Sequence, residues 1–283
     1  MARASTFSRP GLKRLTAGVT VAAVAVSLSI AQASGVFAGS SPRTQPKPTV
    51  VLVHGAWADA SGWSGEVKML EHDGYPVVAV PNELRSLSGD AADVAAFLKT
   101  IKGPIVLVGH SYGGAVITNA ATGIANVRAL VYIDAFAPDQ GEFATKLAGL
   151  DSALSAPDPT TVFNFVPADQ APTPATDLYL KTPVFLKSFA NGLPVTQARI
   201  LAASQRPATL GAITEPSGVP AWRTIPSWYL IGTEDRIIPP AAERSMAEHA
   251  GAKISYFKAG HLGLISDPKS VTRVIERASV ATG

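Results

Sequence analysis

Short apolar runs recur along the chain between residues 50 and 258, and segments with helical spacing of apolar residues lie between them. The apolar runs predict buried strands at about 50–54, 77–81, 104–109, 128–134, 226–231 and 253–258. The segments with helical spacing predict helices at about 62–73, 89–101, 113–123, 240–250 and 268–279. Regular alternation of strands and helices is typical of a parallel sheet covered by helices on both faces. We therefore expect one α/β domain over residues 49–283, built on a mostly parallel six-stranded sheet.

This alternation stops between about residue 138 and residue 225, where the chain is rich in Pro, Thr and Ala and has only short apolar clusters such as 162–166. We expect an inserted lid that follows the strand ending at Asp134 and covers one edge of the sheet. The aromatic residues that could wall a pocket beneath it are Trp57, Phe163, Phe165 and Trp222, with Tyr179, Phe185 and Phe189 as further candidates. The alternative is that the aromatic residues of the lid form only its own small core.

The first 48 residues have a different pattern. A basic stretch ending at Arg14 precedes an uncharged run from Leu15 to Pro42, which predicts a signal peptide over residues 1–38 and a linker over 39–48. Small residues stand three and one positions before two possible cleavage points, after Ala33 and after Ala38, and we favour the second. The chain is then secreted to the extracellular medium, without stable membrane association. The run is also long enough to span a bilayer, so the alternative is a membrane anchor formed by an uncleaved signal.

Charge and cysteine content narrow the classes of partner. The whole chain has a net charge of +3, but removal of the predicted signal leaves 20 basic and 21 acidic residues. A nearly neutral mature protein gives no reason to expect a nucleic-acid partner. The sequence contains no cysteine, which excludes disulfide bonds and a lipoprotein anchor. The pattern gives no prediction of the oligomeric state.

The segment from Gly109 to Gly113 is the clearest candidate for chemistry. It places Ser111 between the apolar run 104–108 and the helix-compatible segment 115–121. The two glycines keep Cβ atoms out of a tight strand-to-helix turn, so Ser111 can adopt a strained backbone and present its hydroxyl at the end of the strand. The segment therefore predicts a nucleophile elbow.

Three other predicted strands end in residues that a serine nucleophile needs. His54-Gly55-Ala56-Trp57 follows the first strand, Gly232-Thr233-Glu234-Asp235 the fifth, and Ala259-Gly260-His261 the sixth. From Val50 to about Ala278, these residues resemble the α/β-hydrolase superfamily, and within it the small esterases related to plant methyl esterases and hydroxynitrile lyases. The resemblance implies the α/β-hydrolase fold and the following roles: Ser111 as nucleophile, His261 as general base, Asp235 as the carboxylate that orients it, and the N–H groups of Ala56 and Tyr112 as the oxyanion hole. Asp134 stays open as an alternative acid.

The resemblance also implies a serine hydrolase that cleaves small-molecule carboxylic esters through an acyl-enzyme intermediate, with no cofactor and no metal. Hydrolysis of lactones or amides, or perhydrolysis, would use the same residues. A serine at the elbow excludes haloalkane dehalogenases and epoxide hydrolases, which need a carboxylate there. The related hydroxynitrile lyases have a threonine and a lysine where this chain has Gly55 and Leu262, which disfavours a lyase. A non-catalytic binding protein would be expected if the triad were broken, and its residues are all present.

Overall fold

The computed structural model describes residues 46–282, and its centre is a six-stranded sheet in which every neighbouring pair of strands is parallel. The predicted α/β class and six-stranded core are confirmed, and each strand begins and ends within two residues of its predicted bounds. Side by side, the strands are β2 (Val77–Val80), β1 (Thr49–Val53), β3 (Ile105–Ser111), β4 (Val127–Ala135), β8 (Ser227–Gly232) and β9 (Lys253–Phe257).

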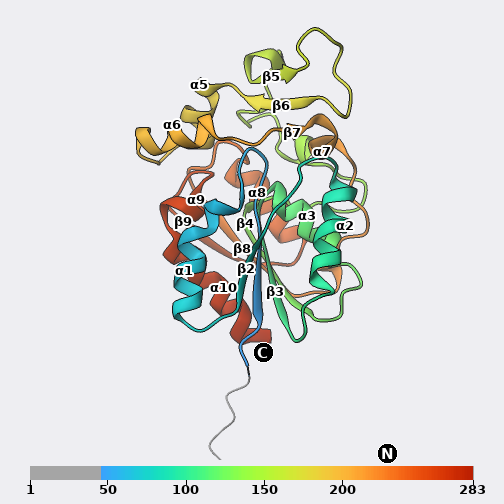
Figure 1. Ribbon diagram of the computed structural model, residues 1–283, viewed down its shortest axis with the longest axis vertical. Helices are drawn as coiled ribbons and strands as arrows, with labels where there is room; N and C mark the ends of the chain where they lie inside the picture. Colours follow the sequence, from blue (N-terminus) through green and yellow to red (C-terminus); the bar gives the residue numbers. More distant parts are fainter. Residues whose placement is uncertain (1–45, 283) are drawn as a thin grey trace, which may run out of the picture. The chain divides into compact units, whose positions relative to one another are not determined.

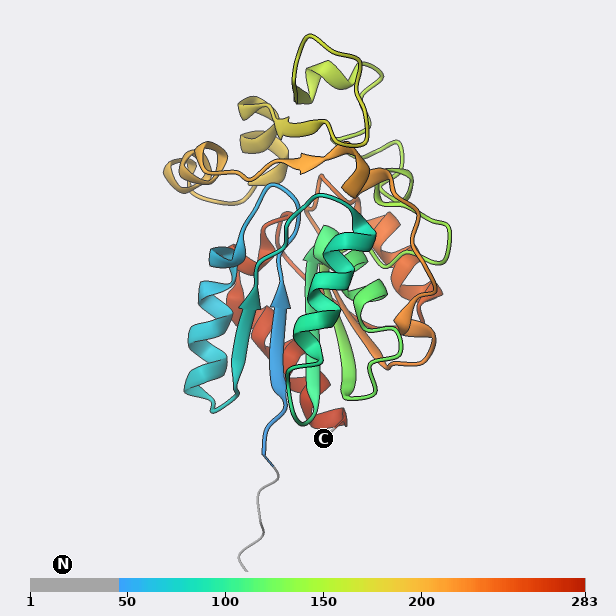
Figure 2. The same cartoon turned by 45° about the vertical axis from the view of Figure 1, so that its right-hand side comes forward.

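Helices cover both faces of this sheet (Figures 1 and 2). On one face α1 (Ser64–His72) packs against α10 (Pro268–Thr282), and on the other α2 (Leu87–Leu98) packs against α3 (Tyr112–Ala120). Helix α8 (Pro240–His249) packs against β8 and β9. Two short helical turns complete this part of the chain, η1 (Ala60–Trp63) before α1 and α9 (Gly263–Ser266) before α10.

The burial of the strands explains why the apolar runs identify them. All seven residues of β3 are buried, since its neighbours β1 and β4 shield its edges and helices shield its faces. A strand enclosed in this way has no solvent side and needs no alternation of polar and apolar residues. The edge strand β9 is different, because Lys253 and Tyr256 are exposed.

The chain between β4 and β8 forms an insertion at the carboxyl ends of the sheet strands, seen above the sheet in Figures 1 and 2. The insertion contains a three-stranded antiparallel sheet in the order β5-β6-β7, which the sequence pattern did not predict. The elements of the insertion are α4 (Ala144–Leu147), η2 (Pro159–Thr161), β5 (Phe163–Val166), β6 (Asp177–Leu180), α5 (Thr182–Val184), η3 (Phe185–Phe189), α6 (Val195–Ala203), β7 (Ala208–Thr209), α7 (Leu210–Thr214) and η4 (Ala221–Arg223).

The predicted signal peptide, with both candidate cleavage points, lies outside the described residues, as does most of the predicted linker. Among residues 46–282, no helix is both long enough and apolar enough to span a bilayer.

Candidate active site

Ser111 occupies a strained turn at the carboxyl end of β3. Its φ of 52° and ψ of −126° are unusual for a residue with a side chain, and such a conformation costs about 1–3 kcal/mol. The flanking glycines make the turn possible. A Cβ atom on Gly109 would lie 2.5 Å from the carbonyl oxygen of Gly113, and one on Gly113 would collide with the carbonyl oxygen of Val53. Helix α3 starts at the next residue, so the turn has the geometry expected of a nucleophile elbow.

His261 connects Ser111 to Asp235 through its two ring nitrogens. Its Nε2 lies 2.9 Å from the Ser111 Oγ, and its Nδ1 lies 2.7 Å from the Asp235 Oδ2. These three residues come from the ends of β3, β8 and β9, and all are buried. With Nδ1 protonated and donating to the carboxylate, Nε2 is free to accept the serine proton.

Hydrogen bonds with backbone groups fix the positions of Asp235 and His261. The Asp235 Oδ1 accepts hydrogen bonds from the N–H groups of Ile237 at 2.7 Å and Ile238 at 3.0 Å. The His110 ring donates from Nε2 to the carbonyl oxygen of His261 at 2.8 Å. Burial holds the pKa of His110 well below its usual value, so this ring is neutral and serves as a fixed support for His261.

The loop after β1 brings Ala56 to the same place. Ala56 and Tyr112 both line the cavity beside Ser111. Gly55 allows this approach, because a Cβ atom there would lie 2.6 Å from the Ser111 Cβ. Burial lowers the pKa of His54, and the neutral ring accepts a hydrogen bond from the Asn82 N–H at 2.9 Å while its Nδ1 lies 2.9 Å from the Gly55 carbonyl oxygen. His54 therefore stiffens the loop on which Ala56 lies.

The cavity beside Ser111 is narrow and apolar. Its volume is only about 20 Å³. Its walls come from both the sheet domain and the insertion. Besides Trp57 and the residues named above, the apolar lining residues are Phe136, Ala144, Ala148, Leu154, Ile213 and Ile237.

Of the predicted pocket residues, Trp57 lines this cavity. Phe185 and Phe189 line a neighbouring hollow together with Trp57, and the Phe189 ring lies 5.2 Å from that of His261. Phe163 stacks on Trp57 with ring centroids 5.8 Å apart, and Phe165 packs edge-on against Phe163 at 6.2 Å, so these two belong to the core of the insertion. Trp222 lies beside helix α8, where its ring meets that of His249 at 5.3 Å and its Nε1 donates to the carbonyl oxygen of Pro138.

Asp134, the alternative acid, makes no hydrogen bond to the His261 ring. Its Oδ1 accepts a hydrogen bond from the Gly232 N–H at 2.6 Å, which ties the end of β4 to the end of β8. Asp134 forms a buried cluster with Asp235 and Glu243 of α8, in which one carboxylate oxygen from each residue lies within 4.8 Å of the others. Glu243 was not predicted as a site residue, because the sequence of a helix does not show whether one of its acidic residues is buried or exposed.

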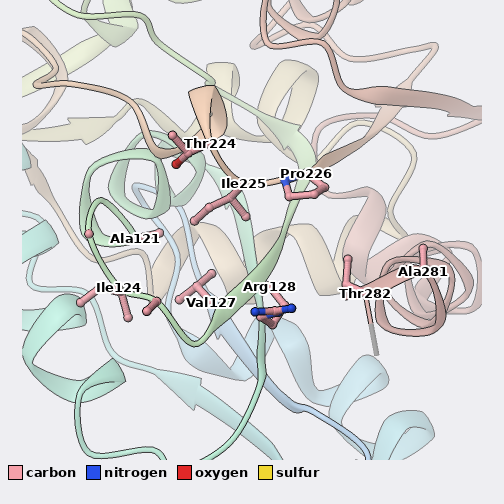
Figure 3. Close-up of a pocket in the computed structure, with 11 residues that line it drawn as sticks. Ala121, Ile124, Val127, Arg128, Thr224, Ile225, Pro226, Ala281 and Thr282 are labelled. Carbon is pink, nitrogen blue, oxygen red and sulfur yellow. The ribbon is translucent and has the colours of Figure 1, made fainter.

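A second, open hollow lies at the opposite edge of the sheet (Figure 3). It is lined by residues at the amino ends of β4 and β8 and at the end of α10, among them Val127, Arg128, Pro226 and Thr282. None of its lining residues is an acid, a histidine or a serine, so the catalytic chemistry is assigned to the Ser111 edge.

Comparison with known proteins agrees with the fold. Residues 50–274 match the model of the alpha/beta hydrolase family, and the chain belongs to this family. Over 261 residues it is 28% identical to an alpha/beta hydrolase, nvfD, of Aspergillus novofumigatus (strain IBT 16806), a match that covers 82% of this chain and 97% of the relative. Over 105 residues it is 35% identical to a carbendazim hydrolyzing esterase of Nocardioides sp. (strain SG-4G), and this match spans 32% of the chain and 43% of that esterase.

Among solved structures, polyneuridine aldehyde esterase superposes with a TM-score of 0.69 at 21% sequence identity. The superposition covers 82% of this chain and 99% of that esterase. At this level of identity the likeness concerns the fold, and it extends over almost the entire esterase.

Proposed function

We propose that this member of the alpha/beta hydrolase family is a secreted serine hydrolase that cleaves carboxylic esters of small molecules through an acyl-enzyme intermediate. The observation on which the proposal depends is the continuous contact from Ser111 through His261 to Asp235. The names of two similar proteins, a carbendazim hydrolyzing esterase and polyneuridine aldehyde esterase, support ester hydrolysis as the reaction.

The reaction follows from these contacts. His261 takes the proton from the Ser111 hydroxyl as its oxygen attacks the ester carbonyl carbon, and Asp235 stabilises the imidazolium that forms. The N–H groups of Ala56 and Tyr112 stabilise the negative charge on the carbonyl oxygen. Collapse of this intermediate releases the alcohol, which takes the proton from His261. Water then attacks the acyl-enzyme by the same steps and releases the acid.

The cavity limits the acyl group that the site can hold. Its lining is almost entirely apolar, and its volume is small. Short, uncharged acyl groups therefore fit best, and larger ones require the insertion to move. Lactones and amides could react by the same steps, and hydrogen peroxide could replace water in the second half of the reaction.

The test is the change Ser111→Ala, assayed with p-nitrophenyl esters of increasing acyl length and with a fluorophosphonate that labels activated serines. We expect the wild type to hydrolyse the acetate and butyrate esters fastest. The variant should lose labelling and lose up to about 10⁶-fold in kcat. Circular dichroism serves as the control for folding. Labelling of the variant at the wild-type rate would refute the role of Ser111.

A hydroxynitrile lyase is the alternative that differs most in chemistry. Such a reaction needs a group that stabilises departing cyanide, and Leu262 is a buried, uncharged residue. In this backbone the position of Gly55 also has no room for a side chain beside Ser111. We expect p-nitrophenyl acetate hydrolysis to exceed cyanide release from mandelonitrile in the same preparation, and the opposite ranking would favour the lyase. If neither reaction is detected, a hydrolase of narrow substrate range or a binding protein becomes the better hypothesis.

A further inference from the structure

Three carboxyl groups lie together directly behind His261. Asp134, Asp235 and Glu243 are at most 5% exposed, and one oxygen of each lies within 4.8 Å of one oxygen of the others. Their sources in the chain are separate: the end of β4, the loop after β8 and the first turn of α8. Only Asp235 has a place in the reaction proposed above.

The hydrogen bonds around the cluster indicate that Asp235 carries its negative charge. Asp235 accepts two backbone N–H bonds and faces the His261 ring, which uses three of about four acceptor positions of a carboxylate. Glu243 has no hydrogen-bond partner on either oxygen, and Asp134 has none on Oδ2. Three buried anions at this separation, with so few donors, would repel one another strongly.

The unpaired carboxylate oxygens of Asp134 and Glu243 would destabilise the folded protein if both groups were ionised, because a buried charged group without a hydrogen-bond donor has a high free energy. Protonation of both groups removes this cost. A protonated carboxyl becomes a donor, and the one acceptor position left on Asp235 is available to it. Burial, followed by the charge of Asp235, raises the pKa of Asp134 well above its usual value. Burial, followed by the charges of Asp134 and Asp235, raises the pKa of Glu243 in the same way.

We propose that Asp134 and Glu243 are positioning residues of the Ser111 site, which remain neutral carboxylic acids and supply a hydrogen bond to the Asp235 carboxylate. The proton of Glu243 points to Asp235, and the proton of Asp134 points to Glu243. The cluster then has a single negative charge behind His261. This inference rests on the proposed serine-hydrolase function for its kinetic consequences, whereas the protonation itself is independent of that function.

The surroundings of the cluster fit this assignment. Besides Asp134 and Asp235, the titratable group near Glu243 is Tyr229 of β8. The Tyr229 hydroxyl donates to the Ala135 carbonyl oxygen, so it is not available to Glu243. Gly232 and Gly263 make room for Asp134, because a Cβ atom on them would lie 2.8 Å from its Oδ1 and 2.6 Å from its Oδ2, respectively.

Two substitutions at Glu243 separate a neutral acid from an anion. Glu243→Gln keeps the shape, the neutrality and a donor, so kcat/KM should stay within about threefold of wild type and its pH profile should not move. Glu243→Met removes the donor, so kcat should fall about tenfold. The acid limb of the profile should then move to higher pH, because the unshared charge of Asp235 favours the imidazolium. Glu248→Gln, on the exposed side of the same helix, is the matched control.

If Glu243 were an anion in the wild type, Glu243→Gln would remove a negative charge and move the acid limb to lower pH. That result would overturn the proposal. So would stabilisation of the wild type by Ca²⁺ or Mn²⁺ in a thermal melt that Glu243→Gln abolishes, because a cation would then balance the cluster. Glu243→Gln is the decisive variant if Glu243→Met does not fold.

Infrared difference spectroscopy tests the protonation without any turnover. The spectrum of the wild type minus that of Glu243→Gln at neutral pH should contain the carbonyl band of a protonated carboxylic acid. A carboxylate band in its place would refute the proposal, even if esterase activity is found. Conversely, the acid band together with no activity towards any ester would leave the cluster as described and count against the proposed function.

Discussion

At the scale of single residues, the strain at Ser111 has a clear structural origin. The register between β3 and β4 shifts between His110 and Ser111, and the carbonyl of Ser111 accepts a hydrogen bond from the Phe136 N–H at 3.1 Å. The chain is thus held on both sides of the turn, and the positive φ persists because its surroundings leave no other conformation.

Asp235 and Asp134 should respond very differently to replacement by asparagine. Asp235→Asn should lower kcat about 10⁴-fold, because an amide stabilises the wrong tautomer of His261. Asp134→Asn should change kcat less than about tenfold, since an amide oxygen can still accept the Gly232 N–H at the position of Oδ1. Steady-state kinetics on both variants provide the measurement. The reverse ranking would mean that Asp134 is the acid that orients His261.

The sequence was sufficient to find Ser111, His261 and both candidate aspartates, because the carboxyl ends of parallel strands meet at one edge and the glycines mark the turn. It favoured Asp235 only through the family resemblance, because Asp134 and Asp235 both lie at the carboxyl ends of buried strands at that edge. Only the positions of their oxygen atoms distinguish them. Glu243 could not be found at all, since its burial depends on the packing of α8 against β8 and β9, which are separate segments of the chain.

At the scale of elements, the strands of the main sheet and the larger helices were predictable because their burial requires apolar runs or a helical spacing of apolar residues. The elements of the insertion could not be predicted in this way. Its strands have two to four residues and its helices three to five, except α6 with nine, so most of these elements are too short for a period to be recognised in them. Its structure depends instead on contacts with the sheet domain, such as the ion pair between Arg85 and Asp177 at 2.6 Å.

Helix α1 contains a buried acid outside the cluster of Asp134, Asp235 and Glu243, and its effect on stability can be measured. Glu66 is fully buried, and neither of its carboxylate oxygens has a partner. Burial, with a smaller contribution from the charge of Asp267, raises the pKa of Glu66 to about 8. Between its ordinary value of 4.5 and about 8, the folded protein keeps a proton that the unfolded chain has released. The free energy of unfolding therefore falls as the pH rises through this interval.

We expect Glu66→Gln to remove this loss and to raise the melting temperature at pH 8 relative to wild type, with a much smaller difference at pH 4.5. Each pKa unit corresponds to about 1.4 kcal/mol, so the gain at pH 8 is at most about 5 kcal/mol. Thermal melts across this range measure it. Glu71→Gln, on the exposed side of α1, is the control. Parallel pH dependences for Glu66→Gln and wild type would show that Glu66 is not protonated in the folded state.

At the scale of the whole molecule, the predicted signal differs from the rest of the chain in charge, because it contains basic residues and no acidic ones. Four of the 24 basic residues lie in the first 14 positions, and no acid precedes residue 39. The described domain contains the elements of the Ser111 site without residues 1–38. Removal of that segment is therefore compatible with a complete enzyme, as the proposed secretion requires.

The corresponding prediction is a mature form that begins near Gly39. Mass spectrometry of the culture supernatant should detect this species, with a form cleaved after Ala33 as the alternative. Ala38→Arg should abolish the form that begins near Gly39, because a signal peptidase needs a small residue directly before the bond that it cleaves. Recovery of only the full-length chain from the membrane fraction would instead favour an uncleaved anchor.

The contact between Trp57 and the insertion has a consequence for the timing of turnover. The Trp57 indole donates to the Leu178 carbonyl oxygen at 2.9 Å, and Trp57 directly follows Ala56 in a loop where its own φ is 56°. If β6 lifts to admit a bulky ester, this bond either breaks or pulls on the backbone next to the oxyanion donor. The ester would then enter while the insertion is lifted, and the reaction would occur only after the insertion has closed again. For such esters the slow step would be reclosure of the insertion, and turnover would depend on solvent viscosity while the attack by Ser111 itself stayed fast.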